Sequence, residues 1–294
     1  MSAHATYRER AQPRVGFFTD TTICIGCKAC EVACKEWNDV PDDPQGFQGT
    51  SYDNSGELGA NRWRHVAFIE QRRPVGVQDG APDSLVQEAA LQGIAEEAGI
   101  ELHDDAGMRW LMSSDVCKHC SEAACLDVCP TGAIFRTEYD TVVVQDDVCN
   151  GCGYCVPACP FGVLDQRKPD GRVWKCTLCY DRLKDDLEPA CAKACPTNSI
   201  QFGELDELRE RASRRLYELK DRGVEDARLY GDDPDNGVGG FGAFFMLLDE
   251  PEAYRLPPDP VVTTRHLGEI WKTTALAAGA LGAAVAGAVL AGRR

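Results

Sequence analysis

Residues 149–160 read Cys-Asn-Gly-Cys-Gly-Tyr-Cys-Val-Pro-Ala-Cys-Pro. This spacing, C-x2-C-x2-C-x3-C followed by proline, binds a 4Fe-4S cube through cysteine thiolates. Sixteen cysteines occur in all, in four runs, of which the first and third have the C-x2-C-x2-C-x3-C spacing: Cys24, Cys27, Cys30, Cys34; Cys117, Cys120, Cys125, Cys129; Cys149, Cys152, Cys155, Cys159; Cys176, Cys179, Cys191, Cys195. Each cube takes four thiolates, so the count predicts four 4Fe-4S clusters with no cysteine left over.

The loop that carries each run must wrap tightly around its cube. Backbone N–H groups in such a turn point at the sulfurs and form an anion-binding concavity. Gly26, Gly151 and Gly153 lie inside these turns, where we expect a positive φ or a close backbone approach. The fourth cysteine of a run lies too far along the chain to close the same cube. In two-cluster ferredoxins it ligates the neighbouring cube, so we expect the runs to work in pairs.

Two other uses of cysteine explain the pattern less well. A disulfide framework also has an even number of cysteines. It does not account for four tight runs, three of which end in Cys-Pro, and a chain of this length can bury a core without cross-links. Zinc ribbons contain C-x2-C pairs but no third and fourth cysteine at these intervals.

Composition excludes several classes of function. The formal net charge is −16, whereas a nucleic-acid partner requires a basic surface. We find no P-loop, no nucleophile elbow and no convincing dinucleotide-binding loop, because a strand-like run follows the glycines of residues 237–242 where a helix should begin. We therefore expect no bond-making chemistry in this chain. Residues 1–14 are polar, so we expect no N-terminal signal peptide.

The C-terminal end has the composition of a membrane span. Residues 273–292 are twenty residues without a charge, bordered by basic residues on both sides. A helix of this length spans about 30 Å, the thickness of a bilayer core. The sequence therefore predicts a transmembrane helix at residues 271–292, and a buried helix of a soluble core is the alternative. Small residues recur along one face at Gly279, Ala283 and Gly287, which suits packing against another helix in lipid.

An internal repeat organises the rest of the chain. Residues 15–24 and 142–149 both read as a short apolar strand, a polar turn and a cysteine loop. Residues 129–135 and 195–202 both read as a helix end, a turn and a strand. The repeat predicts an α+β fold of two ferredoxin-like dicluster modules related by a pseudo-two-fold axis. The second and third runs build module B, and the first and fourth build module A around it.

This scheme divides the chain into six parts. Module A has its first half at residues 1–40 and its second half at residues 167–204. Between these halves lie an insertion at residues 41–111 and module B at residues 112–166. A C-terminal docking segment at residues 205–268 and the transmembrane helix at residues 271–292 follow. Within them we predict a short helix at residues 84–99 and a charged amphipathic helix at residues 205–222.

The crossed fourth cysteines predict four ligand sets. Set 1 is Cys24, Cys27, Cys30 and Cys195; set 2 is Cys34, Cys176, Cys179 and Cys191; set 3 is Cys117, Cys120, Cys125 and Cys159; set 4 is Cys129, Cys149, Cys152 and Cys155. Three neighbouring side chains are candidates for adjusting a cluster's potential, by charge or hydrogen bonding: Lys28, His119 and Lys175. A loop side chain is the favoured explanation for His119, and a surface charge explains Lys28 and Lys175 equally well.

The motifs resemble those of one family, the iron–sulfur (beta) subunits of membrane-bound respiratory formate dehydrogenases. These are four-cluster subunits that serve molybdenum or tungsten bis-pterin oxidoreductases. The similar stretches cover nearly the whole chain: residues 24–39, 149–155, 175–179, 188–191, 237–240, 256–260 and 271–272. The cysteine runs alone also fit relatives that serve nitrate, polysulfide or dimethyl sulfoxide chemistry. The C-terminal end with its membrane helix favours the formate dehydrogenase subunits among these families.

The resemblance implies a linear order of clusters, with set 1 facing the catalytic alpha subunit and set 4 facing the membrane. It implies that electrons from formate reach a b-type cytochrome (gamma) subunit and then quinone. It also implies a chain that is anchored in the cell membrane with its bulk on the outer side. Two alternatives stay open: the same role for another oxidoreductase, such as a hydrogenase or polysulfide reductase, and a soluble polyferredoxin.

Overall fold

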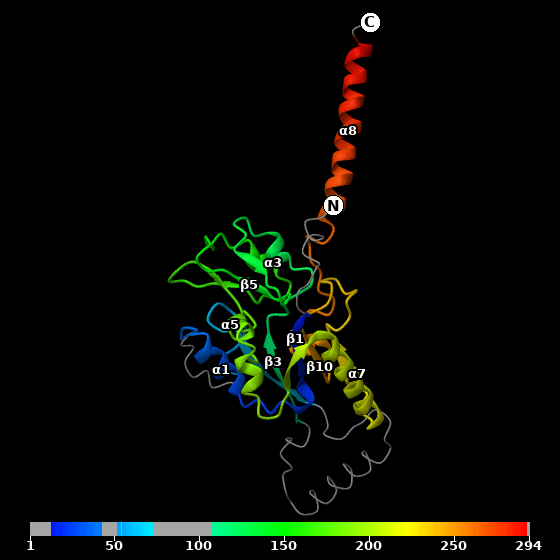
Figure 1. The fold of residues 1–294 in the computed structure, drawn as a ribbon. Helices are drawn as coiled ribbons and strands as arrows, with labels where there is room; N and C mark the ends of the chain where they lie inside the picture. The colour runs from blue at the N-terminus through cyan, green and yellow to red at the C-terminus, as the bar shows by residue number, and fades with distance from the viewer. Residues whose placement is uncertain (1–12, 43–51, 54, 73–107, 293–294) are drawn as a thin grey trace, which may run out of the picture.

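The computed structural model describes residues 13–42, 52–53, 55–72 and 108–292. A four-stranded sheet lies at the centre of the molecule, with strand order β8-β1-β10-β9 (Figure 1). The strands are β1 (Val15–Asp20), β8 (Ile200–Glu204), β9 (Arg228–Tyr230) and β10 (Ala243–Leu247). β1 pairs parallel with β10 and antiparallel with β8, and β9 pairs antiparallel with β10. The sheet thus joins segments from both ends of the chain.

Helix α7 (Leu205–Asp221) packs on this sheet. It confirms the helix predicted at residues 205–222. Its apolar side chains Leu205, Leu208 and Ala212 are buried in one core with Phe18 and Phe244, while the rest of the helix is charged and exposed. The strand expected after the glycines of residues 237–242 is β10. A Cβ on Gly16 would lie 2.0 Å from the carbonyl oxygen of Gly242, so β1 can approach this segment only with glycine there.

The predicted pairing of runs is visible in the secondary structure. The first and fourth runs meet through the β1–β8 pair and through packing of α1 (Ala29–Trp37) on α6 (Ala190–Lys193). The second and third runs meet through the β4–β5 hairpin (Ile134–Arg136 and Val142–Val144) and the contact of α3 (Ala124–Asp127) with α4 (Cys155–Ala158). The mixed α+β composition and the four strands expected beside the runs are therefore confirmed.

Several short elements complete the fold. They are the 3-10 helices η2 (Thr21–Ile23) and η4 (Pro251–Tyr254), helix α5 (Tyr180–Lys184) and the two-stranded pair β6 (Asp165–Gln166) and β7 (Val173–Trp174).

The predicted insertion contains a long antiparallel hairpin. β2 (Arg64–Arg72) pairs with β3 (Met108–Val116) along its whole length, from Arg64 opposite Val116 to Arg72 opposite Met108. β3 runs through the predicted boundary between residues 111 and 112 and ends directly before the second cysteine run. The helix predicted at residues 84–99 lies outside the described residues. The hairpin packs against α1, so the insertion contributes to the surroundings of the first run.

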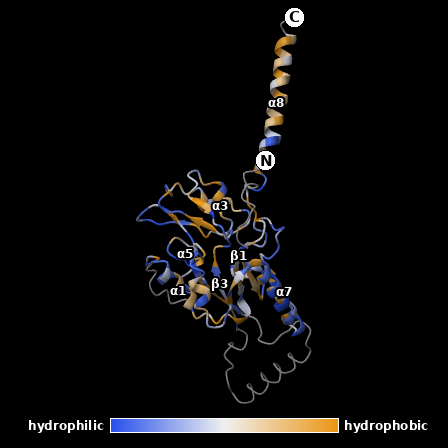
Figure 2. Cartoon of the chain, in the orientation of Figure 1, coloured by the Kyte–Doolittle hydropathy of each residue, from blue (hydrophilic) through white to orange (hydrophobic). Residues whose placement is uncertain are grey.

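Helix α8 (Leu267–Ala291) extends away from the body, and none of its side chains is buried. It is the one helix in the described part of the chain that is long and apolar enough to cross a membrane, and Figure 2 shows that hydrophobic residues predominate along most of its length. It begins four residues before the predicted start at residue 271, and Glu269 and Lys272 form an i,i+3 ion pair of 2.7 Å in its first turns. Its exposure argues against a buried soluble helix.

Candidate functional site

Set 1 surrounds a cavity. Cys24 and Cys27 come from the loop between η2 and α1, Cys30 lies in the first turn of α1, Cys195 follows α6, and all four line the same cavity. Burial is the largest cause that raises the pKa of the Cys24 thiol, and the other three thiols of the set raise it further. Gly26 has φ +63°, and a Cβ there would lie 2.7 Å from Met112 and Phe68 of the hairpin. The loop therefore needs glycine both for its turn and for its contact with the insertion.

Set 2 is the most buried group. Cys34 of α1 meets the thiols on either side of α5, and all four cysteines of the set are buried. Burial raises the pKa of Cys34 well above 9.0, and the other three thiols of the set raise it further. The side-chain amide of Asn38 lies 3.8 Å from the sulfurs of both Cys34 and Cys179. Residues from opposite ends of the cysteine-rich region thus converge on one place.

Set 3 and set 4 lie in the predicted module B. Burial raises the pKa of Cys120 well above 9.0, and the three other thiols of set 3 raise it further. Burial also raises the pKa of Cys155 to about 11, and the three other thiols of set 4 contribute in the same direction. The structure therefore brings together the four cysteines of every predicted set, close enough for each to disfavour a negative charge on the others.

The glycine-rich stretch of residues 237–242 supports the loop of set 3. The backbone N–H groups of Ser121 and Glu122 donate to the carbonyls of Gly240 and Val238 at 3.1 and 2.9 Å. Gly239 has φ +71°. This stretch holds a cysteine loop in place, which is a structural role for glycines that resemble a nucleotide-binding motif in sequence.

The four sets follow one another in space. Cys30 of set 1 is electrostatically coupled to Cys191 of set 2, Cys176 of set 2 to Cys117 of set 3, and Cys125 of set 3 to Cys155 of set 4. Burial is again the largest cause, and it raises the pKa of Cys176 and of Cys125 to about 12. Thiols of set 1 thus lie near set 2, thiols of set 2 near set 3 and thiols of set 3 near set 4.

The thiols suit a cube better than a single metal ion. All sixteen cysteines lie in the described residues, and all are free thiols, which excludes a disulfide framework. Among the described residues, no three His, Cys, Asp or Glu side chains converge closely enough to hold one metal ion. A 4Fe-4S cube instead places its thiolates at four separate corners, and a cavity with four thiols on its wall, as in set 1, accommodates that arrangement.

The three candidate neighbours have different surroundings. Lys175 is 2% exposed, which rules out a surface role, and its ammonium donates to the carbonyl of Cys176 at 2.9 Å. The Nδ1 atom of His119 accepts from the N–H of Val142 at 3.1 Å, and burial lowers its pKa well below 6.5. Lys28 is half-buried and lies 3.0 Å from Ser55 Oγ. Lys175 is the strongest of the three as a fixed charge beside the thiols.

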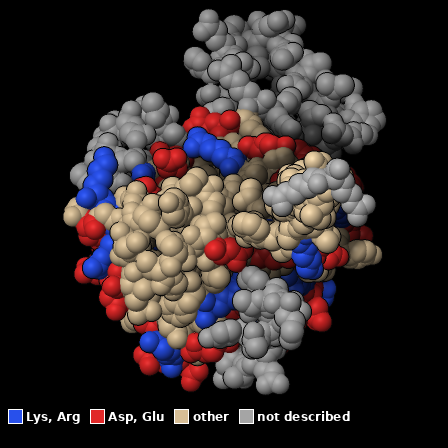
Figure 3. All heavy atoms as spheres, turned by 90° about the horizontal axis from the view of Figure 1, so that it is seen from above, with Lys and Arg blue, Asp and Glu red and all other residues tan. Residues whose placement is uncertain are grey.

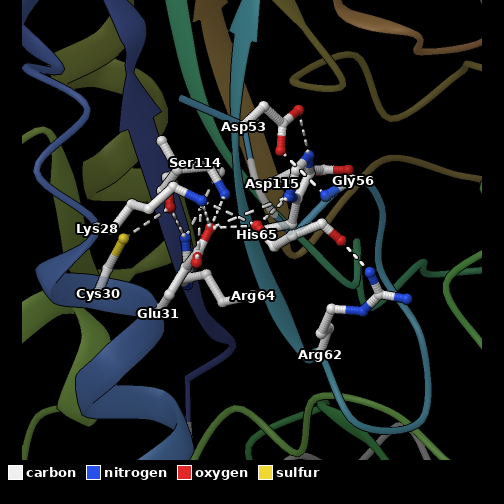
Figure 4. Close-up of polar contacts among 12 residues, drawn as sticks. Lys28, Cys30, Glu31, Asp53, Gly56, Arg62, Arg64, His65, Ser114 and Asp115 are labelled. Atoms are coloured by element: carbon white, nitrogen blue, oxygen red, sulfur yellow. Dashed lines mark hydrogen bonds and ion pairs between the residues drawn. The ribbon is translucent and has the colours of Figure 1, made fainter. Parts of the chain in front are cut away.

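A polar network joins the first run to the hairpin (Figure 4). The carboxylate of Glu31 in α1 accepts from the backbone N–H of Val66 in β2 and from Ser55 Oγ. On the other strand, Ser114 Oγ lies 3.2 Å from the sulfur of Cys30 and accepts from Arg64 Nη1 at 2.9 Å. The β2–β3 hairpin therefore reaches a predicted cluster ligand directly.

Sequence reasoning missed three of these polar neighbours. Lys118 is buried beside set 3, over the rings of Phe161 and Phe245, and its place between two cysteines of one run was a usable signal. Arg64 and Ser114 lie outside every cysteine run. No sequence pattern marks them, because strand pairing alone brings them to set 1 and set 2.

Comparison with known proteins gives the same classification. Two 4Fe-4S dicluster domain families match residues 23–133 and 108–205. The iron–sulfur subunit of nitrate-inducible formate dehydrogenase from Escherichia coli is 39% identical over 257 residues, which cover 86% of this chain and 75% of that protein.

Two further relatives extend the comparison. The formate dehydrogenase iron–sulfur subunit of Haemophilus influenzae is 39% identical, with 83% of this chain and 68% of that protein covered. A subunit of the anaerobic dimethyl sulfoxide reductase of E. coli is 33% identical, with 67% and 76% covered. The chain holds 4Fe-4S clusters in two dicluster domains and belongs to the family of formate dehydrogenase iron–sulfur subunits.

Proposed function

We propose that this chain conducts electrons through four 4Fe-4S clusters, from a formate-oxidising molybdenum or tungsten subunit to a membrane cytochrome b and quinone. An electron-transfer role in a respiratory oxidoreductase follows from its family. The nearness of thiols in successive sets supports the finer statement. Each cluster exchanges one electron at a time when bound, and the residues of this chain hold, insulate and order the positions between which electrons move.

Exposure of the thiols supports entry and exit at the two ends. Only Cys27 of set 1 and Cys152 of set 4 are exposed among the sixteen cysteines, whereas all of set 2 is buried. Apolar side chains stand beside each exposed thiol: Ile25 is 58% exposed and Tyr154 is 63% exposed. Partners that docked on these two surfaces would approach the first and last sets, while the protein shields the sets between them.

The position of α8 supports the assignment of set 4 to the membrane end. The segment before α8 binds module B, because Thr264 Oγ1 donates to Asp127 at 2.6 Å and Arg265 pairs with Glu122 at 2.9 Å. The face from which α8 extends includes a wide area without Lys, Arg, Asp or Glu (Figure 3), and residues 148–164 of the third run carry no charge. An uncharged face beside a membrane span suits a membrane subunit.

The finer organisation is part of the same proposal. A single membrane span fits α8, and we place the bulk of the chain on the outer side, as the family resemblance implies. The pseudo-two-fold relation of modules A and B, the six segment limits and the four ligand sets stay predictions. Catalysis belongs to a partner subunit, since the relatives are subunits of larger complexes and this chain carries no motif for bond-making chemistry.

The test is reduction by substrate. The complex is purified from membranes without oxygen, its iron, molybdenum and tungsten are measured, and formate is added while the clusters are followed by electron paramagnetic resonance. We expect four reduced 4Fe-4S signals and one of the two metals. A complex without either metal, or clusters that dimethyl sulfoxide oxidises but formate does not reduce, would instead favour the role of the dimethyl sulfoxide reductase relative. Recovery of the chain as a soluble monomer would favour a polyferredoxin.

A further inference from the structure

Arg64 is a buried cation at the junction of set 1 and set 2. It is the first residue of β2, it is 3% exposed, and its guanidinium lies 5.0 Å from the centre of the Phe17 ring. Its Nη1 atom donates to the Oγ and the carbonyl oxygen of Ser114, at 2.9 and 3.3 Å. These contacts fix the orientation of the side chain within the core.

Beyond Ser114, the guanidinium has one further side-chain contact, a hydrogen bond to the thiol of Cys191 in set 2 that lowers the pKa of that thiol, while two of its nitrogens make no well-formed hydrogen bond. These two nitrogens, Nε and Nη2, are buried. An unsatisfied donor on a buried charged group costs about 1–3 kcal/mol or more, so a native protein normally supplies an acceptor. The groups around Arg64 show which acceptor is missing, because they are cysteine sulfurs of two sets.

Arg64 lies beside both sets, because it lines one cavity together with Cys34 of set 2 and contacts Cys30 of set 1 through Ser114. Burial raises the pKa of Cys30 in set 1 and of Cys191 in set 2, while Arg64 lowers both values. Burial acts to lower the pKa of Arg64 itself, but Cys191, Cys30, Cys176 and Cys34 outweigh it and the net direction is upward. Arginine stays protonated throughout the physiological range. A fixed positive charge therefore faces thiols of two sets at once.

Ser114 extends this contact to set 1. Its hydroxyl accepts from Arg64 and lies 3.2 Å from the sulfur of Cys30, so the O–H is free to donate to that sulfur. The arrangement, visible in Figure 4, gives Cys30 a charge-assisted hydrogen bond through one side chain. Neither residue belongs to a cysteine run, and both come from the β2–β3 hairpin.

We propose that Arg64 is a positioning residue shared by the first two clusters, which it orients by N–H donation and whose potentials it raises together. The proposal rests on the cluster sets proposed above. Reduction of a cluster adds one electron and no proton, which increases its negative charge by one. A buried positive charge stabilises that state, so it keeps the first two clusters easier to reduce.

The experiment compares three variants in the purified complex: Arg64→Met, Arg64→Lys and the control Arg109→Met. Arg109 lies on β3 of the same hairpin, paired with Asp226 and hydrogen-bonded to the carbonyl of Leu248. Each cluster is titrated with redox mediators and dithionite and followed by electron paramagnetic resonance, and signals of sets 1 and 2 are identified with Cys27→Ser and Cys179→Ser.

In Arg64→Met we expect two signals, those of sets 1 and 2, to become harder to reduce. At the wild-type midpoint, their reduced-to-oxidised ratio should fall at least tenfold, which is about 59 mV for a one-electron couple. Arg64→Lys keeps the positive charge but lacks the planar N–H donors of the guanidinium. The midpoint potentials of sets 1 and 2 should therefore shift less in this variant than in Arg64→Met. The signals of sets 3 and 4, and all signals in the Arg109 control, should not move.

Several results would overturn the proposal. They are an unshifted pair of signals at full iron content, an equal shift of all four signals, or a shift in the Arg109 control as large as in Arg64→Met. If Arg64→Met loses iron, the loss must be confined to sets 1 and 2, and loss from sets 3 and 4 contradicts the proposal. Because the titration uses dithionite, it gives an answer even if formate fails to reduce the complex, a result that would count against the proposed function alone.

Discussion

Replacing Gly151 with alanine should weaken retention of the cluster in set 4, because the loop leaves no room for a methyl group. Gly151 has φ +72°, and a Cβ there would lie 2.3 Å from the carbonyl oxygen of Gly171. Ordinary contacts begin at 3.4 Å, so the loop of the third run would have to move about 1 Å away from the turn between β6 and β7. That movement displaces Cys149 and Cys152 on either side of it.

The expected magnitude has two parts. A left-handed backbone at a residue other than glycine costs about 1–2 kcal/mol. Relief of the overlap adds about 1–3 kcal/mol, as in other overpacked sites. Gly132 separates these parts, since it lies in the same module with φ +70°, and a Cβ there would meet no atom within 4 Å. Gly132→Ala therefore carries the conformational part alone.

The assay is the rate at which set 4 loses iron to a chelator at a fixed temperature, with the other clusters as internal references. An extra 1.4 kcal/mol released on loss of the cluster corresponds to roughly a tenfold faster rate. We therefore expect Gly151→Ala to lose this cluster about tenfold faster than Gly132→Ala, or faster still. Equal rates in the two variants would refute the reasoning, because they would show that the contact with Gly171 imposes no constraint.

Three further predictions concern other parts of the molecule. Cys152→Ala should leave a three-iron cluster with its own paramagnetic signal, while the other three cubes persist; loss of two clusters would contradict the ligand sets. Lys175→Met should make the clusters of Cys125 and Cys176 harder to reduce by about 40–90 mV, from roughly 1–2 kcal/mol of lost charge interaction, and unchanged potentials in a redox titration would show that its charge is screened. Truncation before Leu267 should release the chain from membranes after high-speed centrifugation with its iron content unchanged, and a truncated chain that still sediments with membranes would count against α8 as the anchor.

Much of the local structure was predictable because it depends on neighbours in sequence. The positive φ values of Gly26, Gly151 and Gly153 were expected from the tight cysteine loops. Helix α7 follows from apolar residues at helical spacing, and the strands beside the runs follow from short apolar segments next to turns. These features involve hydrogen bonds and side-chain contacts within a few residues, so the local sequence contains the information that defines them.

The surroundings of the candidate site were predictable only in part. The repeat indicated which runs come together, and the ligand sets drawn from it stay a prediction, although the structure places the thiols of each set near one another. The depth of burial around Lys175 was not predictable, since a lysine next to a cysteine is as consistent with a surface as with a core. The helix predicted at residues 84–99 lies outside the described residues.

The sequence by itself determined that this is an iron–sulfur protein with a charge-free C-terminal helix, since cysteine spacing and hydropathy are local properties. Only the tertiary structure decided which polar side chains lie beside the cysteine sets. Arg64 and Ser114 reach the first two sets because β2 pairs with β3 and the hairpin packs on α1. Contacts between residues far apart in sequence depend on strand pairing and shared burial, which no single segment encodes.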